Sequence, residues 1–210
     1  MSKRKLSQKY IIGIDEVGRG AIAGVITVGA VLMPAKFKIK NLKFKIPLKD
    51  SKKLSPKQRE EWFDFIKKQK IFYSVASISP KIIDKINISN AANLAATRAL
   101  QKLANSHWGL ATRAKIFLDG GLYLNQKTLV ASSYTLNPKT VIKGDEKIPA
   151  ITLASIVAKV SRDRMMIRLH KKYPQYGFDK HKGYGTKEHL KAIKKYGQSP
   201  IHRKSFKLKF

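Results

Sequence analysis

The sequence predicts an α/β fold with one main core, on the basis of three observations. Short apolar runs rich in β-branched residues, typical of buried strands, alternate with segments that begin with helix-capping residues. Acidic residues beside glycine follow several of the apolar runs. The chain has 210 residues, enough for one good core or at most two small ones, so we expect one domain with a small appendage.

The stretch from Tyr10 to Gly24, YIIGIDEVGRGAIAG, organises the rest of the chain. Its apolar run predicts a buried strand, and Asp15 and Glu16 come where that strand should end. The basic triplet Gly18-Arg19-Gly20 follows at once. Unpaired charges beside a core cost on the order of several kcal/mol unless a cation neutralises them. The placement therefore indicates a functional site, and we expect a divalent-metal nuclease centre.

The next two segments differ in charge. Val25 to Met33 is apolar throughout, which predicts a second strand covered on both faces and ended by Pro34. From Ala35 to Lys53, lysines alternate with apolar residues and almost no acids balance them. This segment predicts either an edge strand or a basic loop that faces phosphate, and the pattern alone does not choose.

A helix is predicted over residues 56–68. Ser55 is its N-cap, Pro56 its first residue and Gln58 the partner in a capping box. Its expected buried stripe is Trp62, Phe63 and Ile66. Its acidic residues are Glu60, Glu61 and Asp64. Early-turn carboxylates favour the helix dipole and pair with lysine one turn on, so we do not count these as catalytic.

The middle of the chain repeats the opening pattern. Residues 71–78 predict a strand, Ser79-Pro80 a short helix ending near Ile86, and residues 90–104 an alanine-rich helix. Residues 114–118 then predict a strand that delivers Asp119 into two glycines. An apolar strand is thus again followed by an acid and glycine.

The third acid of this kind follows residues 140–143, a predicted short strand that ends at Gly144-Asp145-Glu146. Pro149 begins a long helix reaching about Tyr173, apolar in its first half and basic in its second. Within it, Asp163 is expected to make a local ion pair.

The C-terminal stretch begins with a loop in which glycine, aromatic and basic residues are interleaved, YPQYGFDKHKGYG. Thr186 then caps a helix that ends at Gly197. Such a loop suits a surface that holds a sugar-phosphate backbone and stacks on a base or ribose. The alternative, that its tyrosines merely pack, is left open.

Composition narrows the class of partner. Forty-four Lys and Arg residues against thirteen Asp and Glu give a net charge of +31, which points to a polyanion, most often nucleic acid. Lysine preference on ordinary surfaces is the competing explanation, so charge identifies no site. The absence of cysteine excludes disulfides, zinc ribbons and thiol catalysis. The basic N-terminus, MSKRKLSQKY, precedes too short an apolar run for a signal peptide or membrane span, so we expect a soluble cytoplasmic protein.

Four of the thirteen acids come at predicted strand ends, where a sheet can bring them together: Asp15, Glu16, Asp119 and Asp145. Such a group would be tolerable only around hard cations, and oxygen ligands suit Mg²⁺ or Mn²⁺. Two such ions can activate a water and stabilise the leaving oxygen in an in-line phosphodiester displacement.

Successive segments of the chain resemble the motifs of one enzyme family, bacterial type 2 ribonuclease H, or ribonuclease HII. They are GIDEVGRG, DSKKLS, LDGG, KGDEKIPAITLASIVAKVSRDR, YGFDKHKGYGTKEH and SPIHRKSF. They follow the family's order and cover almost the whole chain from about residue 10. The resemblance implies a ribonuclease H-like mixed β-sheet flanked by helices, with a C-terminal helical extension. It divides the chain into a basic tail (1–9), a catalytic domain (10–172) and a substrate-contacting C-terminal part (173–210) packed on the same domain.

The resemblance also assigns roles by position. The four acids named above match the family's metal-binding carboxylates. Gly18-Arg19-Gly20 matches the triplet that recognises the ribonucleotide 2′-hydroxyl, Tyr184 the tyrosine that packs on the adjoining deoxyribose, and Lys52 a phosphate-contacting lysine. The implied activity is cleavage 5′ to ribonucleotides in RNA/DNA hybrids and at single ribonucleotides in duplex DNA, giving 3′-hydroxyl and 5′-phosphate ends. We expect a monomer, and whether a clamp protein recruits it is left open.

Two departures from the family pattern lie near the site. Ala21 and Val25 replace prolines that the family usually has, which questions the rigidity of the loop. Thr152-Leu153 replaces a common pair of small residues.

Two alternatives were weighed. The related type 3 enzyme typically has an extra N-terminal domain and lacks the arginine that is Arg19 here. A basic binding protein without activity explains the charge but gives no reason for four acids at strand ends.

Overall fold

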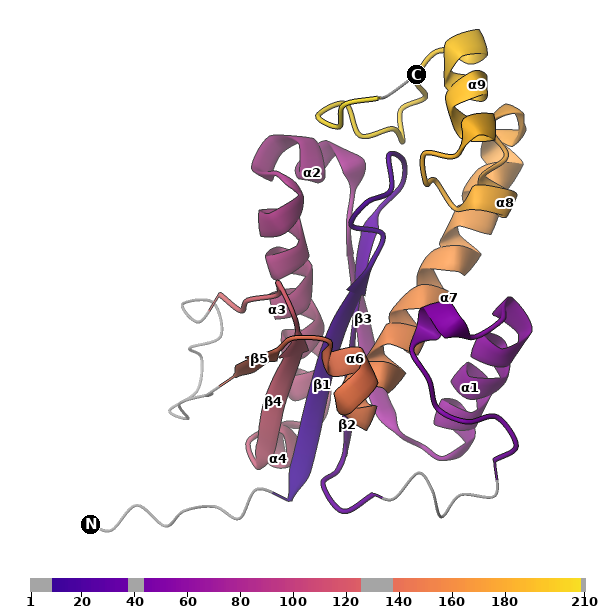
Figure 1. The fold of residues 1–210 in the computed structure, drawn as a ribbon. Helices are drawn as coiled ribbons and strands as arrows, with labels where there is room; N and C mark the ends of the chain where they lie inside the picture. The colour runs from indigo at the N-terminus through magenta and orange to yellow at the C-terminus, as the bar shows by residue number, and fades with distance from the viewer. Residues whose placement is uncertain (1–8, 38–43, 126–137, 209–210) are drawn as a thin grey trace.

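The computed structural model describes residues 9–37, 44–125 and 138–208. They form a five-stranded sheet in the order β3-β2-β1-β4-β5 (Figure 1). The strands are β1 (Tyr10–Val17), β2 (Ile26–Pro34), β3 (Phe72–Ile78), β4 (Ala114–Asp119) and β5 (Lys139–Val141). The helices are α1 (Pro56–Lys68), α2 (Pro80–Ile86), α3 (Ile88–Ser106), α4 (Trp108–Ala111), α6 (Gly144–Lys147), α7 (Pro149–Lys172), α8 (Phe178–His181) and α9 (Lys187–Tyr196), with 3₁₀ turns η2 (Ser51–Lys53) and η3 (Pro174–Tyr176).

β1 lies in the middle of the sheet and determines where its acids lie. It pairs antiparallel with β2, where Asp15 faces Gly29, and parallel with β4, where Ile14 faces Leu118. Parallel neighbours end at the same edge of a sheet, so the acids at the ends of β1 and β4 reach one edge. β5 extends that edge, because it pairs parallel with β4 and places Val141 beside Asp119.

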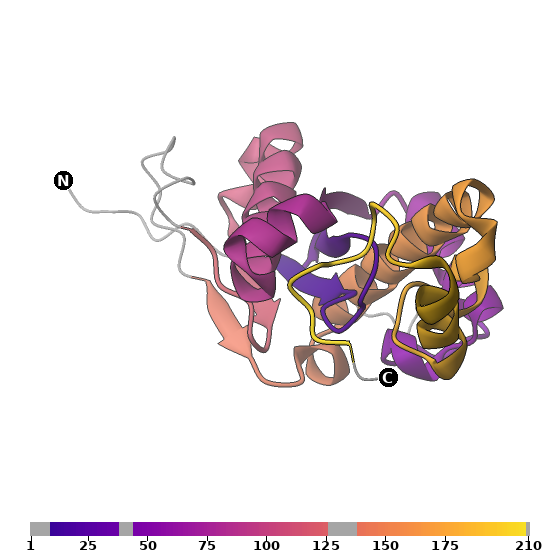
Figure 2. The same cartoon turned by 90° about the horizontal axis from the view of Figure 1, so that it is seen from above.

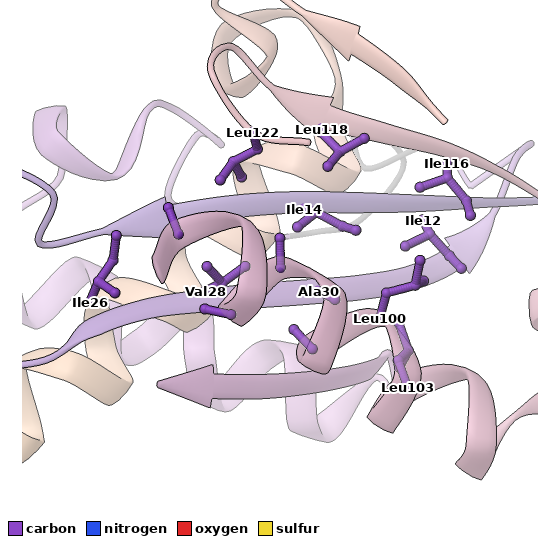
Figure 3. Packing of buried hydrophobic residues seen from close by; sticks show 14 of the residues in the cluster. Ile12, Ile14, Ile26, Val28, Ala30, Leu100, Leu103, Ile116, Leu118 and Leu122 are labelled. Atoms are coloured by element: carbon purple, nitrogen blue, oxygen red, sulfur yellow. The ribbon is translucent and has the colours of Figure 1, made fainter. Parts of the chain in front are cut away.

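Helices cover both faces of the sheet (Figure 1). On one face, α3 packs against the strands through a core that includes Ile14, Val28, Leu100 and Leu118, part of which is drawn in Figure 3. On the other face, α7 and α1 enclose a second core around Trp62 and Leu153. The predicted fold class, a mixed sheet between helices, is confirmed.

The first half of α7 lies directly on the sheet because β1 and β2 present glycine to it. A Cβ atom on Gly13 would lie 2.2 Å from the Ala150 carbonyl carbon, and one on Gly29 would lie 2.5 Å from the Ala154 oxygen. No real Cβ contact is so short, so larger residues at these positions would push the helix off the strands. This close packing brings Ser155 of α7 to Asp15 of β1.

The C-terminal part forms a third, smaller core on the second half of α7. Tyr176, Phe178 and Ile193 pack there with Met166 and with Ile22 of the β1–β2 connection. Ala23 also forms an isolated antiparallel bridge with His202. Figure 2 shows the C-terminal segment crossing over the β1–β2 connection. The predicted C-terminal helical extension therefore packs against the loop that follows β1.

Most predicted elements are present, and several details are corrected. The capping box at Ser55 and Gln58 is confirmed, with both hydrogen bonds formed. The described part of the 35–53 segment contains no strand and ends in η2, which favours the basic loop; residues 38–43 lie outside the described residues. The alanine-rich helix begins at Ile88, with Asn87 as its cap, because the Asn87 side chain accepts the Asn90 N–H. Ser79 makes no side-chain cap bond.

Two predictions about acids need correction, and a third is confirmed. Asp145 does not end a strand: β5 stops at Val141, and Asp145 lies in the short helix α6. No acid lies in the first turn of α1, and Glu60 pairs with Arg164 of α7 instead of a lysine of its own helix. Asp163 does form the expected ion pair, and its partners are Lys159 and Arg59.

Within the described residues, no helix is both long and apolar enough to span a bilayer.

Candidate functional site

The four predicted metal ligands gather around one edge of the sheet, and three local features bring them there. Asp15 and Glu16 occupy the end of β1, and Asp119 is the last residue of β4. The Asp119 Oδ1 atom accepts the Gly144 backbone N–H at 2.7 Å, which ties α6 to the end of β4. Asp145 is the next residue, so this bond sets its position.

The electrostatics show that these carboxylates lie close together. Burial raises the pKa of Asp15 well above its usual value, and the charges of Glu16 and Asp119 raise it further. Burial and then Asp119 likewise raise the pKa of Asp145. Burial also raises the pKa of Glu16, against the opposing effect of Arg19. Buried acids that repel one another in this way are costly without a cation, and they cluster at functional sites.

The donor set fits a divalent cation. Glu16 Oε2 is a buried oxygen for which the described part of the chain supplies no hydrogen-bond partner. All four candidate side chains offer the carboxylate oxygens that Mg²⁺ and Mn²⁺ prefer. No three described His, Asp or Glu side chains lie close enough to enclose an ion as they stand, so the carboxylates would have to close around one.

Arg19 engages one of these carboxylates. Its Nε atom lies 2.8 Å from Glu16 Oε1, and its Nη2 donates to the Gly121 carbonyl at 3.2 Å. The arginine therefore connects the ends of β1 and β4 across the site. It engages Glu16 Oε1, so an ion coordinated by both oxygens of Glu16 would compete with the arginine.

Arg162 of α7 packs against the loop that carries Gly18-Arg19-Gly20 and donates hydrogen bonds to its backbone. Arg162 is fully buried and donates to the Val25 carbonyl at 2.9 Å, the Lys182 carbonyl at 2.9 Å and the Ala23 carbonyl at 3.2 Å. A Cβ atom on Gly18 would lie 2.3 Å from Arg162 Nε, and Gly18 has a φ of +91°. Only glycine combines that backbone angle with so close a guanidinium.

A second buried arginine holds the same loop from the C-terminal segment. Arg203 donates to the Gly24 carbonyl at 2.9 Å and to the Arg19 carbonyl at 3.0 Å. Burial and then the charge of Arg162 lower the pKa of Arg203 to about 9, which leaves it cationic at neutral pH. Where the family usually has prolines, Ala21 is buried and the Val25 carbonyl accepts from Arg162. Guanidinium bonds therefore hold the loop at four of its carbonyls, and the bond from Arg162 to the Lys182 carbonyl links it to the next loop.

Tyr184 lies beside this loop. The Gly183 carbonyl accepts from the backbone N–H groups of Ile22 at 2.9 Å and Ala23 at 3.1 Å. The Arg162 guanidinium carbon lies 5.4 Å from the centre of the Tyr184 ring, a cation–π contact. Arg162 thus contacts both of the segments that the resemblance assigns to junction recognition.

Two buried histidines, His189 and His202, form a chain of hydrogen bonds that ends at the Tyr184 carbonyl. His189 Nδ1 donates to the Tyr184 carbonyl at 2.9 Å, which leaves its Nε2 to accept from His202 Nε2 at 3.0 Å. His202 Nδ1 in turn accepts from the Ser199 backbone N–H and hydroxyl, each at 2.8 Å. The bond between the rings requires an unprotonated Nε2 on His189, and the bonds from Ser199 require an unprotonated Nδ1 on His202, so both imidazoles are neutral in this arrangement. Consistently, burial lowers the pKa of His189 to about 4 and also lowers that of His202.

Lys52 also lies near the candidate carboxylates. It lies in η2, and Ser51 beside it is fixed by a 2.7 Å bond between the Ser51 and Ser155 hydroxyls. Burial lowers the pKa of Lys52, but Asp50, Asp145, Asp15 and Asp119 together raise it above the usual value. The charge of Lys52 is therefore directed toward the site.

Thr152 also bears on the site. Its hydroxyl donates to the Asp145 carbonyl at 2.6 Å and lies 3.2 Å from the Ile148 carbonyl. The residue that departs from the family pattern thus secures the backbone of a candidate ligand.

Sequence reasoning missed the two buried arginines and the two buried histidines. All four lie in segments that carried the resemblance, but Arg and His usually indicate surface or ligand positions. One usable signal was Arg162, which follows an almost uninterrupted apolar half-helix. The hydrogen bonds of Arg203, His189 and His202 depend on tertiary contacts between segments far apart in the chain.

Comparisons with known proteins agree with the site. The family model described as "Ribonuclease HII" matches residues 12–209. A ribonuclease HII from Caldicellulosiruptor bescii is 44% identical over 198 residues, covering 94% of this chain and 86% of the relative. The ribonuclease H2 structure from Pyrococcus horikoshii OT3 is 27% identical, with a TM-score of 0.69 over 95% of this chain and 94% of that one. An Archaeoglobus fulgidus ribonuclease HII, solved in a complex with PCNA, is 28% identical, with a TM-score of 0.62 over 92% of this chain and 91% of that one.

The match to an enzyme family over nearly the whole chain excludes the binding-only alternative, and the type 2 model decides against the type 3 enzyme. The chain belongs to the ribonuclease HII family and is a nuclease of the ribonuclease H type.

Proposed function

We propose that this nuclease cuts the phosphodiester bond 5′ to a ribonucleotide, both in RNA/DNA hybrids and at single ribonucleotides in duplex DNA, and leaves 3′-hydroxyl and 5′-phosphate ends. One observation supports this most directly. Asp15 is buried between Glu16 and Asp119, and the pKa of its carboxyl is raised well above the usual value. A cluster of this kind is suited to phosphodiester hydrolysis with divalent cations.

The metal ligands in this proposal are Asp15, Glu16, Asp119 and Asp145. Two Mg²⁺ or Mn²⁺ ions bound there would activate a water and stabilise the leaving oxygen. The chain's own contribution is to fix the carboxylates. The 2.7 Å bond from Gly144 to Asp119 and the Thr152 bond to the Asp145 carbonyl hold two of them in place.

Substrate recognition is assigned to Gly18-Arg19-Gly20, Tyr184 and Lys52. Gly20 is exposed and has no atom within 4 Å of an added Cβ position, so a sugar can approach its backbone closely. A 2′-hydroxyl both donates and accepts hydrogen bonds, which allows backbone groups there to separate RNA from DNA. The Tyr184 ring, held over Arg162, supplies a flat surface for the neighbouring deoxyribose.

The test is a cleavage map on a DNA duplex with one embedded ribonucleotide, in Mg²⁺ or Mn²⁺. We expect a single cut on the 5′ side of the ribonucleotide, with end chemistry read by ligation and by phosphatase sensitivity. The all-deoxy duplex is the substrate control and Asp119→Asn the enzyme control. No incision by the wild type, or undiminished incision by Asp119→Asn, would refute the proposal. Activity on long hybrids alone would limit it to those substrates.

A further inference from the structure

A basic groove lies next to the candidate site, between α1, α7 and the segment around α8. It encloses about 350 Å³. Six cationic side chains from these three segments line it: Lys57, Arg59, Lys159, Arg164, Lys180 and Lys182. Two carboxylates, Glu60 and Asp163, complete its charged lining. Cations brought together in a hollow focus the electrostatic potential far more than the same charges scattered over a surface.

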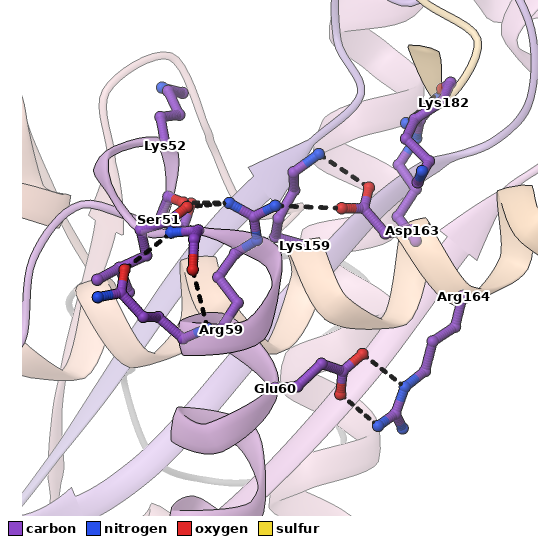
Figure 4. Close-up of polar contacts among 12 residues, drawn as sticks. Ser51, Lys52, Arg59, Glu60, Lys159, Asp163, Arg164 and Lys182 are labelled. Atoms are coloured by element: carbon purple, nitrogen blue, oxygen red, sulfur yellow. Dashed lines mark hydrogen bonds and ion pairs between the residues drawn. The ribbon is translucent and has the colours of Figure 1, made fainter. Parts of the chain in front are cut away.

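Both carboxylates are already engaged, as Figure 4 shows. Asp163 binds Lys159 through Oδ1 at 2.8 Å and Arg59 through Oδ2 at 3.7 Å. Both oxygens of Glu60 accept from Arg164, with Nε at 3.1 Å. These pairs join α1 to α7 and form the fixed part of the groove.

The remaining three lysines lack such partners. Among the residues that the structure describes, no carboxylate lies within 4.0 Å of Lys57, Lys180 or Lys182. Lys57 and Lys180 are exposed, and the Lys182 ammonium donates to the Asp179 carbonyl. The groove therefore carries uncompensated positive charge at its opening, as a phosphate-binding surface requires.

Two side chains that line the groove also contact segments of the candidate active site. Arg59 donates to the Ser51 carbonyl at 2.9 Å, and Lys52 follows directly. On the other side, the Lys159 ammonium lies 6.0 Å from the centre of the Tyr184 ring. Figure 4 shows Lys52 and Lys182 on opposite sides of the Arg59–Asp163–Lys159 contacts. A strand that passes between Lys52 and Tyr184 would thus reach the groove next.

The length of the groove suits a nucleic-acid backbone. From Lys159 to Arg164 along α7 is about 7.5 Å at 1.5 Å per residue. Successive phosphates of one strand advance about 3.4 Å along the duplex axis, so this distance corresponds to about two nucleotide steps.

We propose that this groove is a second phosphate-binding site, which holds the sugar-phosphate backbone of the bound duplex on the side of the site away from the carboxylates. The proposal rests on the proposed function, since it takes a ribonucleotide-containing duplex as the ligand. It adds Lys57, Lys180 and Lys182 to the residues that contact substrate.

The first test compares two double variants of exposed lysines. Lys57→Gln/Lys180→Gln alters the groove, while Lys102→Gln/Lys115→Gln, on α3 and β4, is the matched control. The measurement is the affinity for the one-ribonucleotide duplex in EDTA at several NaCl concentrations. Each lost phosphate contact lowers the slope of log affinity against log salt by about 0.9. We expect a decrease of about 1–2 in the groove variant and the wild-type slope in the control; equal slopes in all three proteins would overturn the proposal.

The second test locates the contact. The chain has no cysteine, so Lys180→Cys provides a unique position for a tethered iron chelate that cuts nearby backbone. We expect cuts clustered on one side of the ribonucleotide at a fixed distance, and none with the chelate at Lys102→Cys. Evenly spread cuts from both positions would overturn the proposal. Both tests run without the catalytic metal, so a wild type that binds but never cuts would refute the proposed function and still leave the groove tested.

Discussion

The Nε2 atoms of His189 and His202 lie 3.0 Å apart inside the C-terminal core, and this bond requires that one of the two Nε2 atoms carries no proton. His189 in turn holds the carbonyl of Tyr184, the residue proposed to sense the junction. The protonation of this buried imidazole pair is therefore coupled to the position of the loop that we propose to contact substrate.

Acid should destabilise the protein through this pair. The pKa of His189 is lowered to about 4 in the folded chain, from 6.5 when unfolded, so the unfolded chain binds protons more readily. The contribution to stability is complete above pH 6.5 and is lost as the pH falls toward 4. From pH 7 to pH 5 the loss is about 2 kcal/mol, at 1.36 kcal/mol per pKa unit. Denaturant unfolding should show the difference in stability between wild type and His189→Gln narrowing by that amount from pH 7 to pH 5.

Replacing Asp15 by asparagine should stabilise the metal-free protein while abolishing cleavage. The pKa of Asp15 is raised by burial and by Glu16 and Asp119, so at pH 7 its charge opposes folding. We expect Asp15→Asn to raise the free energy of unfolding by up to about 2 kcal/mol, the usual upper range for one stabilising substitution. The exposed acid Asp64 provides the control, since Asp64→Asn loses only an ion pair with Lys67. A destabilised Asp15→Asn protein at pH 7 would contradict the electrostatic argument.

Arg162→Lys should weaken junction recognition more than it weakens the fold. Lysine cannot make the three directed bonds by which Arg162 joins the loop at residues 18–25 to the segment before Tyr184. We expect the variant to lose about 1.5–3 kcal/mol of transition-state stabilisation. This loss corresponds to a decrease of roughly 10- to 100-fold in kcat/KM at a single ribonucleotide. Arg168→Lys, an exposed position on the same helix, is the control. If thermal stability and activity fall in both variants alike, the positioning role is wrong.

Arg19 should compete with divalent cations for Glu16. Its Nε atom lies 2.8 Å from Glu16 Oε1, and both side chains are partly buried, so an ion coordinated by both Glu16 oxygens must displace a pair worth about 0.5–1 kcal/mol. Without nucleic acid, Arg19→Gln is expected to bind Mn²⁺ about two- to five-fold more tightly by calorimetry. An affinity equal to or weaker than the wild type would show that the pair does not oppose metal binding.

Local signals predicted much of the fold because they are physically local. The capping box at Ser55 and Gln58, the apolar strands and the long helix after Pro149 each depend on residues within one or two turns. Tertiary contacts decided what the pattern missed. Asp145 reaches the site on α6 because Asp119 binds the Gly144 N–H, a contact between residues 25 positions apart. Likewise, Asp163 finds Arg59 on another helix, which no spacing along α7 could reveal.

The sequence named the candidate carboxylates of the site, but it did not predict the residues that hold the neighbouring loop in place. Asp15, Glu16 and Asp119 do lie at strand ends, where residue type and position along the chain make them candidates, whereas Asp145 was named for a strand end that it does not occupy. The two arginines beneath the loop could not be predicted, because a fully buried guanidinium is stable only where several carbonyls converge, and that convergence exists only in the folded chain. In the folded chain Ala21 is buried and the Val25 carbonyl accepts a hydrogen bond from Arg162, which the absence of proline at these positions did not predict.

The helix α7 has 24 residues, about 36 Å at 1.5 Å per residue, and it carries Ser155, Arg162 and Arg164 in succession. Ser155 faces the carboxylates, Arg162 the loop at residues 18–25 and Arg164 the groove. At about 100° per residue, Ser155 and Arg162 lie on nearly the same side of the helix, whereas Arg164 lies about 200° round from Arg162. Adding or deleting a single residue in the middle of α7 would rotate one set of contacts away from the others. The length of α7 is therefore constrained more tightly than the lengths of the surface loops that it positions.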